Sequence, residues 1–387
     1  MTDDDLTALR DRCDRHLTGH GPVRAADLLA TIPADTEVDV YGDGGVVAAL
    51  EAEVARLLGK PAAVFLPSGI MAQQAVLRVH ADRTGRRTVL FHPTCHLAIH
   101  EDGALERVLG LHGRTVGDPN RLITLEDLRA VAEPPAALLL ELPQRELGGL
   151  LPDWDDVLEQ VAWARSRGAA VHCDGARIWE ASAGSGRSPA ELAELAEPFD
   201  SVYVSFYKGI GALAGCCLAG EEDVVAEVRE WRKRLGGTLY GLWPAAASAL
   251  TLLPQRLARM PEYLAHARAI AAALSDVDGV RVLPDPPQVP MMHLLLAAPH
   301  EQVRAAVRRI AETRGIFTFR GIGTTQDPGV QRVELSVGEA TMRLTPEEVA
   351  AVFRELVDGL APRRASGDDG HEPAALPAAD APREEAP

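Results

Sequence analysis

The sequence predicts an α/β fold, with a mostly parallel sheet in a large domain and a small C-terminal α+β domain. Several short runs are apolar throughout and alternate with helical segments, which is typical of parallel strands covered by helices on both faces. Towards the end of the chain this alternation is lost, which indicates a second, smaller unit. With 387 residues, 47% of them hydrophobic, the chain is long enough to form both.

The first 40 residues are predicted to form a separate N-terminal segment. A helix is expected over residues 3–17, followed by an extended arm that contains Pro22 and Pro33. Residues 46–58 have apolar side chains at helical spacing, and this helix is expected to end at Gly59.

Residues 41–255 are predicted to form the large domain. Its strands are runs of apolar residues, and its helices lie between them. The predicted strands are 62–66, 88–91, 136–141, 169–174, 201–205 and 215–219. The predicted helices are 71–83, 154–167, 189–196, 222–234 and the long segment 244–274, which continues into the next domain.

Residues 256–361 are predicted to form the small C-terminal α+β domain. Its expected strands are 280–283, 291–296 and 333–337, and its expected helices are 301–314 and 346–360. Residues 362–387 consist mainly of proline, alanine and acidic residues, a composition that cannot bury enough apolar surface to order itself. We therefore expect a disordered tail.

Charge and composition exclude several classes of function. The net charge of −17 argues against nucleic-acid or anionic-membrane partners. No apolar stretch of about 18 residues is present that would span a bilayer. The acidic N-terminus lacks the features of a signal peptide, and the five cysteines have no C-x-x-C spacing, so a cytoplasmic protein is expected.

Lys208 and Asp174 are the strongest candidates for chemistry. Each follows or ends an apolar strand, and Gly209 after the lysine lets a small molecule approach the backbone. Burial lowers the pKa of an amine and makes it a better nucleophile towards an aldehyde. A lysine that forms a Schiff base and an aspartate that holds a pyridinium nitrogen are the pair that pyridoxal 5′-phosphate (PLP) requires. The alternative, a surface lysine and a turn aspartate, explains each residue singly but the pair less well.

A phosphate site is predicted where the first core strand gives way to a helix. Ser68, Gly69 and Ile70 present backbone N–H groups at a helix start, which is a favourable place for an anion. An ordinary serine cap is the alternative. Ser205, which lies three residues before the lysine, is a further candidate for a phosphate hydrogen bond.

Three histidines spaced four residues apart, His92, His96 and His100, suggest a metal site at first sight. Pro93 lies between the first two and argues against one helix that presents all three, so no metal is predicted. An imidazole near a strand end is suited instead to stacking on a pyridine ring or to proton transfer.

With these motifs in place, residues 40–360 resemble the threonine aldolase/β-eliminating lyase family of fold-type-I PLP enzymes. The resemblance implies that Lys208 forms the Schiff base, that Asp174 binds the pyridine nitrogen and that His96 stacks on the ring. It also implies Ser68, Gly69 and Ile70 at the phosphate. The resemblance rests on Tyr41-Gly42-Asp43, Ser68-Gly69, His96, Asp174-Gly175-Ala176-Arg177, Lys208-Gly209-Ile210-Gly211 and Gly236-Gly237.

The same resemblance implies how the amino-acid substrate is bound. Arg177, together with Arg332, would bind its carboxylate. Tyr41 would reach the site of a neighbouring subunit, because the family's sites lie at a dimer interface. A homodimer or homotetramer with shared sites is therefore expected.

The sequence departs from the family's pattern on the substrate side. Gln144 stands where the family has a histidine near the substrate hydroxyl, and Ile70 replaces a hydroxyl residue. The family's opening Arg-Ser-Asp-Thr segment has no match, and Thr238 stands where an arginine follows the double glycine. These changes leave the substrate's side chain and stereochemistry open.

Three hypotheses follow. The first is a lyase that cleaves a β-hydroxy-α-amino acid by a retro-aldol reaction to glycine and an aldehyde, with His96 or a water as the base. The second keeps the cofactor but catalyses β-elimination or transfer on another amino acid, because Gln144 cannot act as a base. The third is a non-catalytic relic, against which the retention of Lys208 and Asp174 argues.

Overall fold

A computed structural model describes residues 8–319 and 321–358. Its largest sheet has seven strands, all parallel except β8, which is antiparallel to both of its neighbours. The prediction of a mostly parallel sheet is confirmed. In sheet order the strands are β2 (Ala62–Leu66), β8 (Cys216–Gly220), β7 (Ser201–Ser205), β6 (Ala170–Gly175), β5 (Ala137–Glu141), β3 (Thr88–Phe91) and β4 (His112–Thr115).

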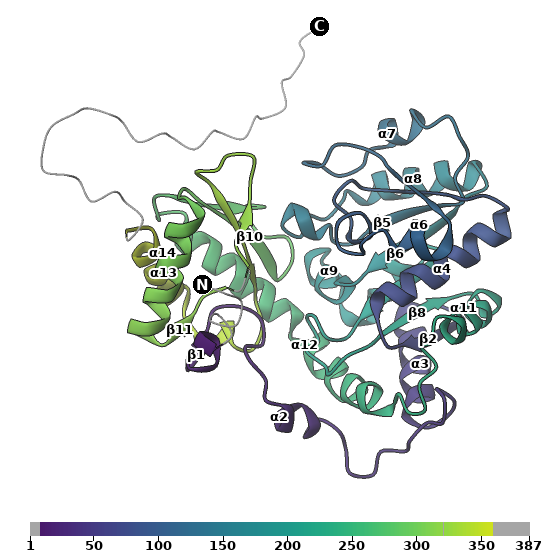
Figure 1. Ribbon diagram of the computed structural model, residues 1–387, viewed down its shortest axis with the longest axis horizontal. Helices are drawn as coiled ribbons and strands as arrows, with labels where there is room; N and C mark the ends of the chain where they lie inside the picture. Colours follow the sequence, from purple (N-terminus) through teal and green to yellow (C-terminus); the bar gives the residue numbers. More distant parts are fainter. Residues whose placement is uncertain (1–7, 320, 359–387) are drawn as a thin grey trace, which may run out of the picture.

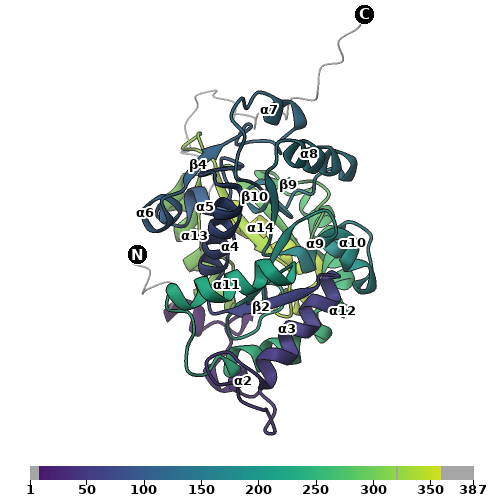
Figure 2. The ribbon, with the colours of Figure 1, turned by 90° about the vertical axis from the view of Figure 1, so that its right-hand side faces the viewer.

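The central strands are apolar throughout because helices cover both faces of the sheet. In β2, for example, Val64 and Leu66 pack on one face while Phe65 packs on the other. Figure 2 shows β2 between α4 and α11 on one side and α3 and α12 on the other. The first face carries α4 (Gly69–Thr84), α6 (Ala104–Leu109) and α11 (Glu222–Arg234). The second face carries α3 (Gly45–Leu58), α8 (Trp154–Ser166), α9 (Ile178–Gly184), α10 (Leu192–Ala196) and α12 (Trp243–Leu274).

A smaller, antiparallel sheet follows in the chain. Figure 1 shows this part beside the larger sheet, with α12 running between the two. Its order is β12 (Gly323–Thr324), β13 (Gln331–Ser336), β10 (Met291–Leu296) and β9 (Val280–Leu283), with α13 (His300–Arg314) and α14 (Pro346–Asp358) packed nearby. The predicted boundary at 255/256 falls inside α12, and the domain limits stay predictions. The predicted tail, 362–387, lies outside the described residues.

The predicted N-terminal helix over residues 3–17 is wrong in its second half. Residues 8–11 are helical, but Arg15–His16 form strand β1, which pairs in parallel with β11 (Ile316–Phe317). Leu9 and Cys13 are buried in a small cluster with Phe317, so tertiary contact rather than helix propensity decides this segment. The segment between β1 and α3 forms the predicted arm. It includes the short helix α2 (Ala25–Leu29), where we expected only extended chain.

The other predicted strands and helices are found with bounds shifted by at most two residues within the described part of the chain. The predicted helix 189–196 is a 3₁₀ turn (Pro189–Glu191) followed by α10. Strand β4 was not predicted because its four residues, His-Gly-Arg-Thr, are exposed and have no apolar pattern. None of the helices in residues 8–319 and 321–358 is long and apolar enough to cross a membrane.

Trp179 ties α9 to the end of β7, three residues before Lys208. Its side chain is fully buried, and its indole N–H donates to the Ser205 carbonyl over 2.9 Å. We expect Trp179→Ala to lower the free energy of unfolding by about 3–5 kcal/mol, because it leaves a large cavity. Urea denaturation checks this value. Leu158→Ala, at a position that is 41% exposed, is the control and should change stability by less than about 0.5 kcal/mol.

Candidate active site

The candidate residues meet at the carboxyl edge of the larger sheet. Asp174 lies near the end of β6, Glu141 ends β5, and Lys208 follows β7. Strand pairing places Glu141 opposite Asp174, and Asp174 opposite Tyr203. Ligands of open α/β sheets bind at this edge, where the strands end and the loops diverge.

Lys208 is an amine without a close acceptor. Within residues 8–319 and 321–358, its Nζ makes no hydrogen bond or ion pair, and the centroid of the Tyr207 ring is 6.0 Å away. Burial lowers the pKa of Lys208, as does the nearby Arg177 guanidinium, whereas Asp174 and Glu141 act in the opposite direction. Burial thus favours the neutral form of this amine, which is the nucleophilic one.

The loop after Lys208 is held closely on both sides. The Gly209 carbonyl accepts a hydrogen bond from His20 Nε2 over 2.9 Å, and a Cβ on Gly209 would collide with Glu180. Gly211 has a φ of +71°, and a Cβ there would lie 2.7 Å from the His20 ring. A side chain is excluded at both positions because Glu180 and His20 lie too close to the backbone. Through His20, the N-terminal arm helps to fix the position of Lys208.

Asp174 is a buried carboxylate that lines a cavity together with Lys208. Its Oδ1 accepts the Ala176 N–H over 3.1 Å. Burial raises the pKa of Asp174, while nearby Lys208 and His96 partly oppose this rise. A protonated ring nitrogen would therefore compensate a charge that the protein itself leaves largely unpaired.

His96 begins the short helix α5 (His96–Ile99) and is oriented by Glu101. Its Nδ1 lies 3.0 Å from Glu101 Oε1, and because a carboxylate only accepts, this nitrogen carries the hydrogen. Glu101 in turn accepts from Gln74 Nε2 over 2.7 Å. His92 Nε2 instead bonds to backbone carbonyls of Asp118 and Arg121, and the described residues contain no group of three or more potential metal ligands.

A cavity of about 150 Å³ joins these groups to the start of α4. Ser68 caps the helix by accepting the Met71 N–H over 3.2 Å, and Gly69 has no room for a Cβ because Tyr203 lies against it. The cavity thus combines a helix N-terminus, an unpaired amine and a buried carboxylate, which fits PLP. Its lining residues are Ser68, Gly69, Ile70, Gln73, His96, Glu101, Asp174, Tyr203, Tyr207 and Lys208.

Three predicted site residues lie elsewhere. Ser205 is fully buried and does not line the cavity, although its Oγ has no hydrogen-bond partner among the described residues. Gln144 is also buried: it donates to Glu141 Oε2 over 3.2 Å and lines a separate small void behind the carboxylate. Tyr41 is 54% exposed and packs edge-on against Tyr240, outside the cavity of its own chain.

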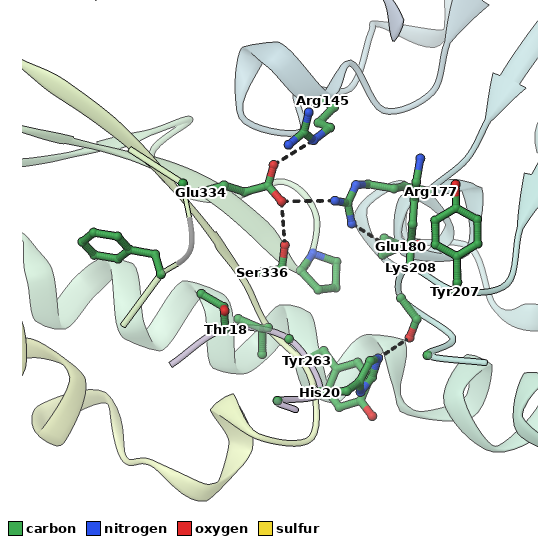
Figure 3. Close-up of a pocket in the computed structure, with 18 of the residues that line it drawn as sticks. Thr18, His20, Arg145, Arg177, Glu180, Tyr207, Lys208, Tyr263, Glu334 and Ser336 are labelled. Atoms are coloured by element: carbon green, nitrogen blue, oxygen red, sulfur yellow. Dashed lines mark hydrogen bonds and ion pairs between the residues drawn. The ribbon is translucent and has the colours of Figure 1, made fainter. Parts of the chain in front are cut away.

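A larger cleft of about 800 Å³ opens beside the cavity, between the two sheets. Arg177 and Arg332 both line it, as predicted for carboxylate ligands, and so does Arg145. Glu334 pairs with Arg177 and Arg145, as Figure 3 shows. Burial alone would raise the pKa of Glu334, but Arg177 and Arg145 outweigh it and lower the pKa, so the carboxylate is ionised at neutral pH.

Several residues of the site were not predicted. Glu141 has the same sequence feature as Asp174, a carboxylate that ends an apolar strand, and this feature could have identified it. The segment from Thr18 to Gly21 lines the cleft only because β1 docks on β11, which no local pattern indicates. The other residues that were missed, which come together only in the folded chain, are His20, Glu101, Arg145, Glu146, Glu180 and Glu334.

Comparison with known proteins agrees with this geometry. A sequence model described as β-eliminating lyase matches residues 19–298. The chain belongs to the β-eliminating lyase family. The predicted family resemblance is thereby confirmed.

Individual relatives point the same way. The low-specificity L-threonine aldolase 1 of Arabidopsis thaliana is 28% identical over 77% of this chain and 86% of its own length. A solved protein of Listeria monocytogenes, provisionally named an L-allo-threonine aldolase, is 35% identical, with a TM-score of 0.86 over 92% of this chain and 99% of its own.

The fold is also found in a protein with much lower sequence identity. The serine palmitoyltransferase of S. paucimobilis, solved with PLP and myriocin bound, shares the fold with a TM-score of 0.65 at 19% identity. The structural match covers 89% of this chain and 86% of the serine palmitoyltransferase chain. The prediction of a fold-type-I enzyme is confirmed.

Proposed function

We propose that this protein is a PLP-dependent lyase that cleaves a β-hydroxy-α-amino acid to glycine and an aldehyde. The observation that carries the proposal is the pairing of Lys208 and Asp174 in one cavity beside the arginines of the cleft. The names of the relatives, low-specificity and allo-threonine aldolases, support this reaction and this class of substrate.

The cofactor would be held at three points. Lys208 would bind its carbonyl carbon covalently, Asp174 its ring nitrogen, and the N–H groups of Gly69 and Ile70 its phosphate. When bound, PLP supplies an electron sink for the pair of electrons that a broken Cα–Cβ bond releases. His96 lines the same cavity, which supports the role of stacking on the ring.

The chain's own residues would orient the substrate and move its protons. Arg177 and Arg332 would bind the carboxylate and so fix the direction of the Cα–Cβ bond. Glu101 holds the Nδ1 hydrogen of His96, which leaves Nε2 with a lone pair that can accept the β-hydroxyl proton, directly or through a water. Lys208 would hold the cofactor covalently, and burial, which lowers the pKa of this amine, favours its neutral, nucleophilic form.

β-Elimination on a different amino acid is the second candidate, because the residue at the family's histidine position does not reach the site. Gln144 is turned behind Glu141, so it can neither bind nor deprotonate a substrate hydroxyl in this arrangement. Among the residues that line the cavity, His96 and the amine of Lys208 then remain as candidate bases for the hydroxyl.

Shared sites in a homodimer or homotetramer remain part of the proposal. Tyr41 and Tyr240 are exposed side by side, and the Tyr41 N–H donates to the Tyr240 carbonyl over 2.9 Å. Such an exposed aromatic pair is suited to a protein interface, where it would bring Tyr41 to a neighbouring site.

An activity panel tests the proposed reaction. Purified protein loaded with PLP is expected to release aldehyde from threonine, allo-threonine or phenylserine, and glycine should accumulate in equal amount. Amino acids with a β-leaving group, scored for pyruvate and ammonia, test the alternative. If no aldehyde forms although the visible band of lysine-bound PLP is present, the aldol reaction is wrong; keto acid would then support elimination.

A further inference from the structure

The charged side chains of the cleft form one chain of alternating ion pairs across the two sheets. We call Arg177, Glu334, Arg145, Glu146 and Arg332, in that order, the five-residue ion chain. Its contacts are Arg177 Nη2 to Glu334 Oε1 at 3.2 Å, Glu334 Oε2 to Arg145 Nε at 2.8 Å, Arg145 Nη1 to Glu146 Oε1 at 2.7 Å, and Glu146 Oε2 to Arg332 Nη2 at 2.7 Å.

Arg145 holds the middle of this chain. It is the arginine that contacts both carboxylates, whereas Arg177 and Arg332 each contact one of the two. Figure 3 shows Glu334 between Arg145 and Arg177. Three arginines and two glutamates leave the ion chain with one unbalanced positive charge, which suits a single added carboxylate.

Two neighbouring side chains, Glu180 and His100, affect the net charge around the ion chain. Glu180 Oε1 lies 3.4 Å from Arg177 Nη1, so a further carboxylate shares this arginine, and burial raises the pKa of Glu180. His100 Nε2 lies 3.3 Å from Glu146 Oε1. Neither neighbour pairs with both Glu146 and Glu334, so neither replaces Arg145.

Arg177 and Arg332 are the proposed carboxylate ligands, yet both are engaged by glutamates in this structure. A substrate carboxylate that takes the same guanidinium atoms therefore displaces Glu334 from Arg177 and Glu146 from Arg332. A buried carboxylate that loses its only cation is strongly unfavourable. Both glutamates avoid this cost if a third cation, in addition to Arg177 and Arg332, stays paired with them.

We propose that Arg145 is a positioning residue that retains Glu334 and Glu146 when the substrate's carboxylate takes Arg177 and Arg332. This inference rests on the proposed function, since it assumes that the cleft binds an amino acid. Arg145 touches the glutamates and acts through them. Its side chain is still 35% exposed, so it has room to follow them.

Replacement of Arg145 by glutamine gives the first test. The two glutamates would then depend on Arg177 and Arg332 alone, and both the affinity for glycine and 1/KM for threonine should fall about tenfold or more. kcat should change by less than about threefold, because no group at the reacting atoms is altered. Glycine binding is read from the change that it causes in the visible spectrum of the PLP-loaded protein, which is independent of turnover.

A second substitution separates the indirect role from direct contact with the substrate. In Arg145→Gln/Glu334→Gln, the glutamate no longer competes for Arg177, so glycine affinity should recover by several fold compared with Arg145→Gln alone. If Arg145 bound the substrate carboxylate itself, the second change would give no recovery. Arg145→Lys keeps the charge but cannot fork between two carboxylates, so its affinity should lie between the wild type and Arg145→Gln.

The matched control is Arg121→Gln, which breaks an exposed ion pair with Asp127 outside the cleft and should leave both constants unchanged. An unchanged glycine affinity in Arg145→Gln, or a loss confined to kcat, would overturn the inference. Wild-type protein that binds glycine but forms no aldehyde would refute the proposed reaction and leave this inference standing. A spectrum that responds to neither glycine nor threonine would overturn both.

Discussion

Lys208→Ala is expected to reduce turnover by about a thousandfold or more, because it removes the amine that we propose binds the cofactor. The visible absorbance band of the lysine-bound cofactor should disappear at the same time. Lys208 is one of three lysines in the chain, with Lys60 and Lys233, and the structure gives neither of these a place at the site. Absorbance spectra and the aldehyde assay measure both effects.

The position of the other two lysines explains why they cannot substitute. Lys60 precedes β2, at the opposite edge of the sheet, and its Nζ donates to the carbonyl of Phe199 over 2.6 Å. Lys233 is exposed near the end of α11. Lys60→Ala and Lys233→Ala are therefore matched controls that should keep the visible band and most of the activity.

The fold of Lys208→Ala should stay intact. Nζ makes no hydrogen bond or ion pair among the described residues, so its removal leaves no partner unsatisfied, and the loss of a partly desolvated amine favours the folded state. The melting temperature should be equal to or slightly above that of the wild type without cofactor. Full activity with an unchanged spectrum would show that another residue binds the cofactor.

The parts of the fold that the sequence predicts well share one physical property. Strands β2, β3, β5, β6 and β7 are buried on both faces, so each appears as an uninterrupted apolar run, and the charged residue that ends such a run is conspicuous. Asp174 and Lys208 could be found for this reason. Ser68 and Gly69 could be found because helix starts have a local chemistry of their own.

The parts that were missed depend on contacts between distant segments. Arg145, Glu146 and Glu334 look like ordinary surface charges in the sequence, and only the approach of β13 to the 3₁₀ turn Arg145–Leu147 joins them into an ion chain. His20 is similar: it contacts the loop after Lys208 because β1 pairs with a strand about 300 residues further along the chain. Local patterns carry no information about such pairings.

The position of the Gln144 side chain has a different cause. Its position in the motif placed it near the substrate, but its side chain turns towards Glu141 and the void behind it. A matching position fixes where the backbone runs, whereas the direction of a side chain depends on its own partners. A buried carboxylate offers an amide a hydrogen bond, and this decides where Gln144 points.

Asp174→Asn is expected to lower kcat by about a hundredfold or more while PLP remains bound. In the proposed site the buried carboxylate would keep the ring nitrogen protonated, and an amide of the same shape cannot do so. The electron sink would weaken at the point where negative charge develops on the substrate. The measurement is kcat with threonine or phenylserine, together with cofactor content from absorbance.

The expected effect should be specific to this carboxylate and its length. Asp174→Glu should recover little activity, because the longer side chain would push the ring away from its alignment with Lys208. Asp200→Asn is the control on the same sheet: Asp200 accepts the Val171 N–H over 2.7 Å at the opposite edge and should affect stability more than turnover. If Asp174→Asn retained cofactor and near-normal kcat, Asp174 would be a turn residue that holds Ala176, and the role of the carboxyl edge as an electron-sink site would have to be abandoned.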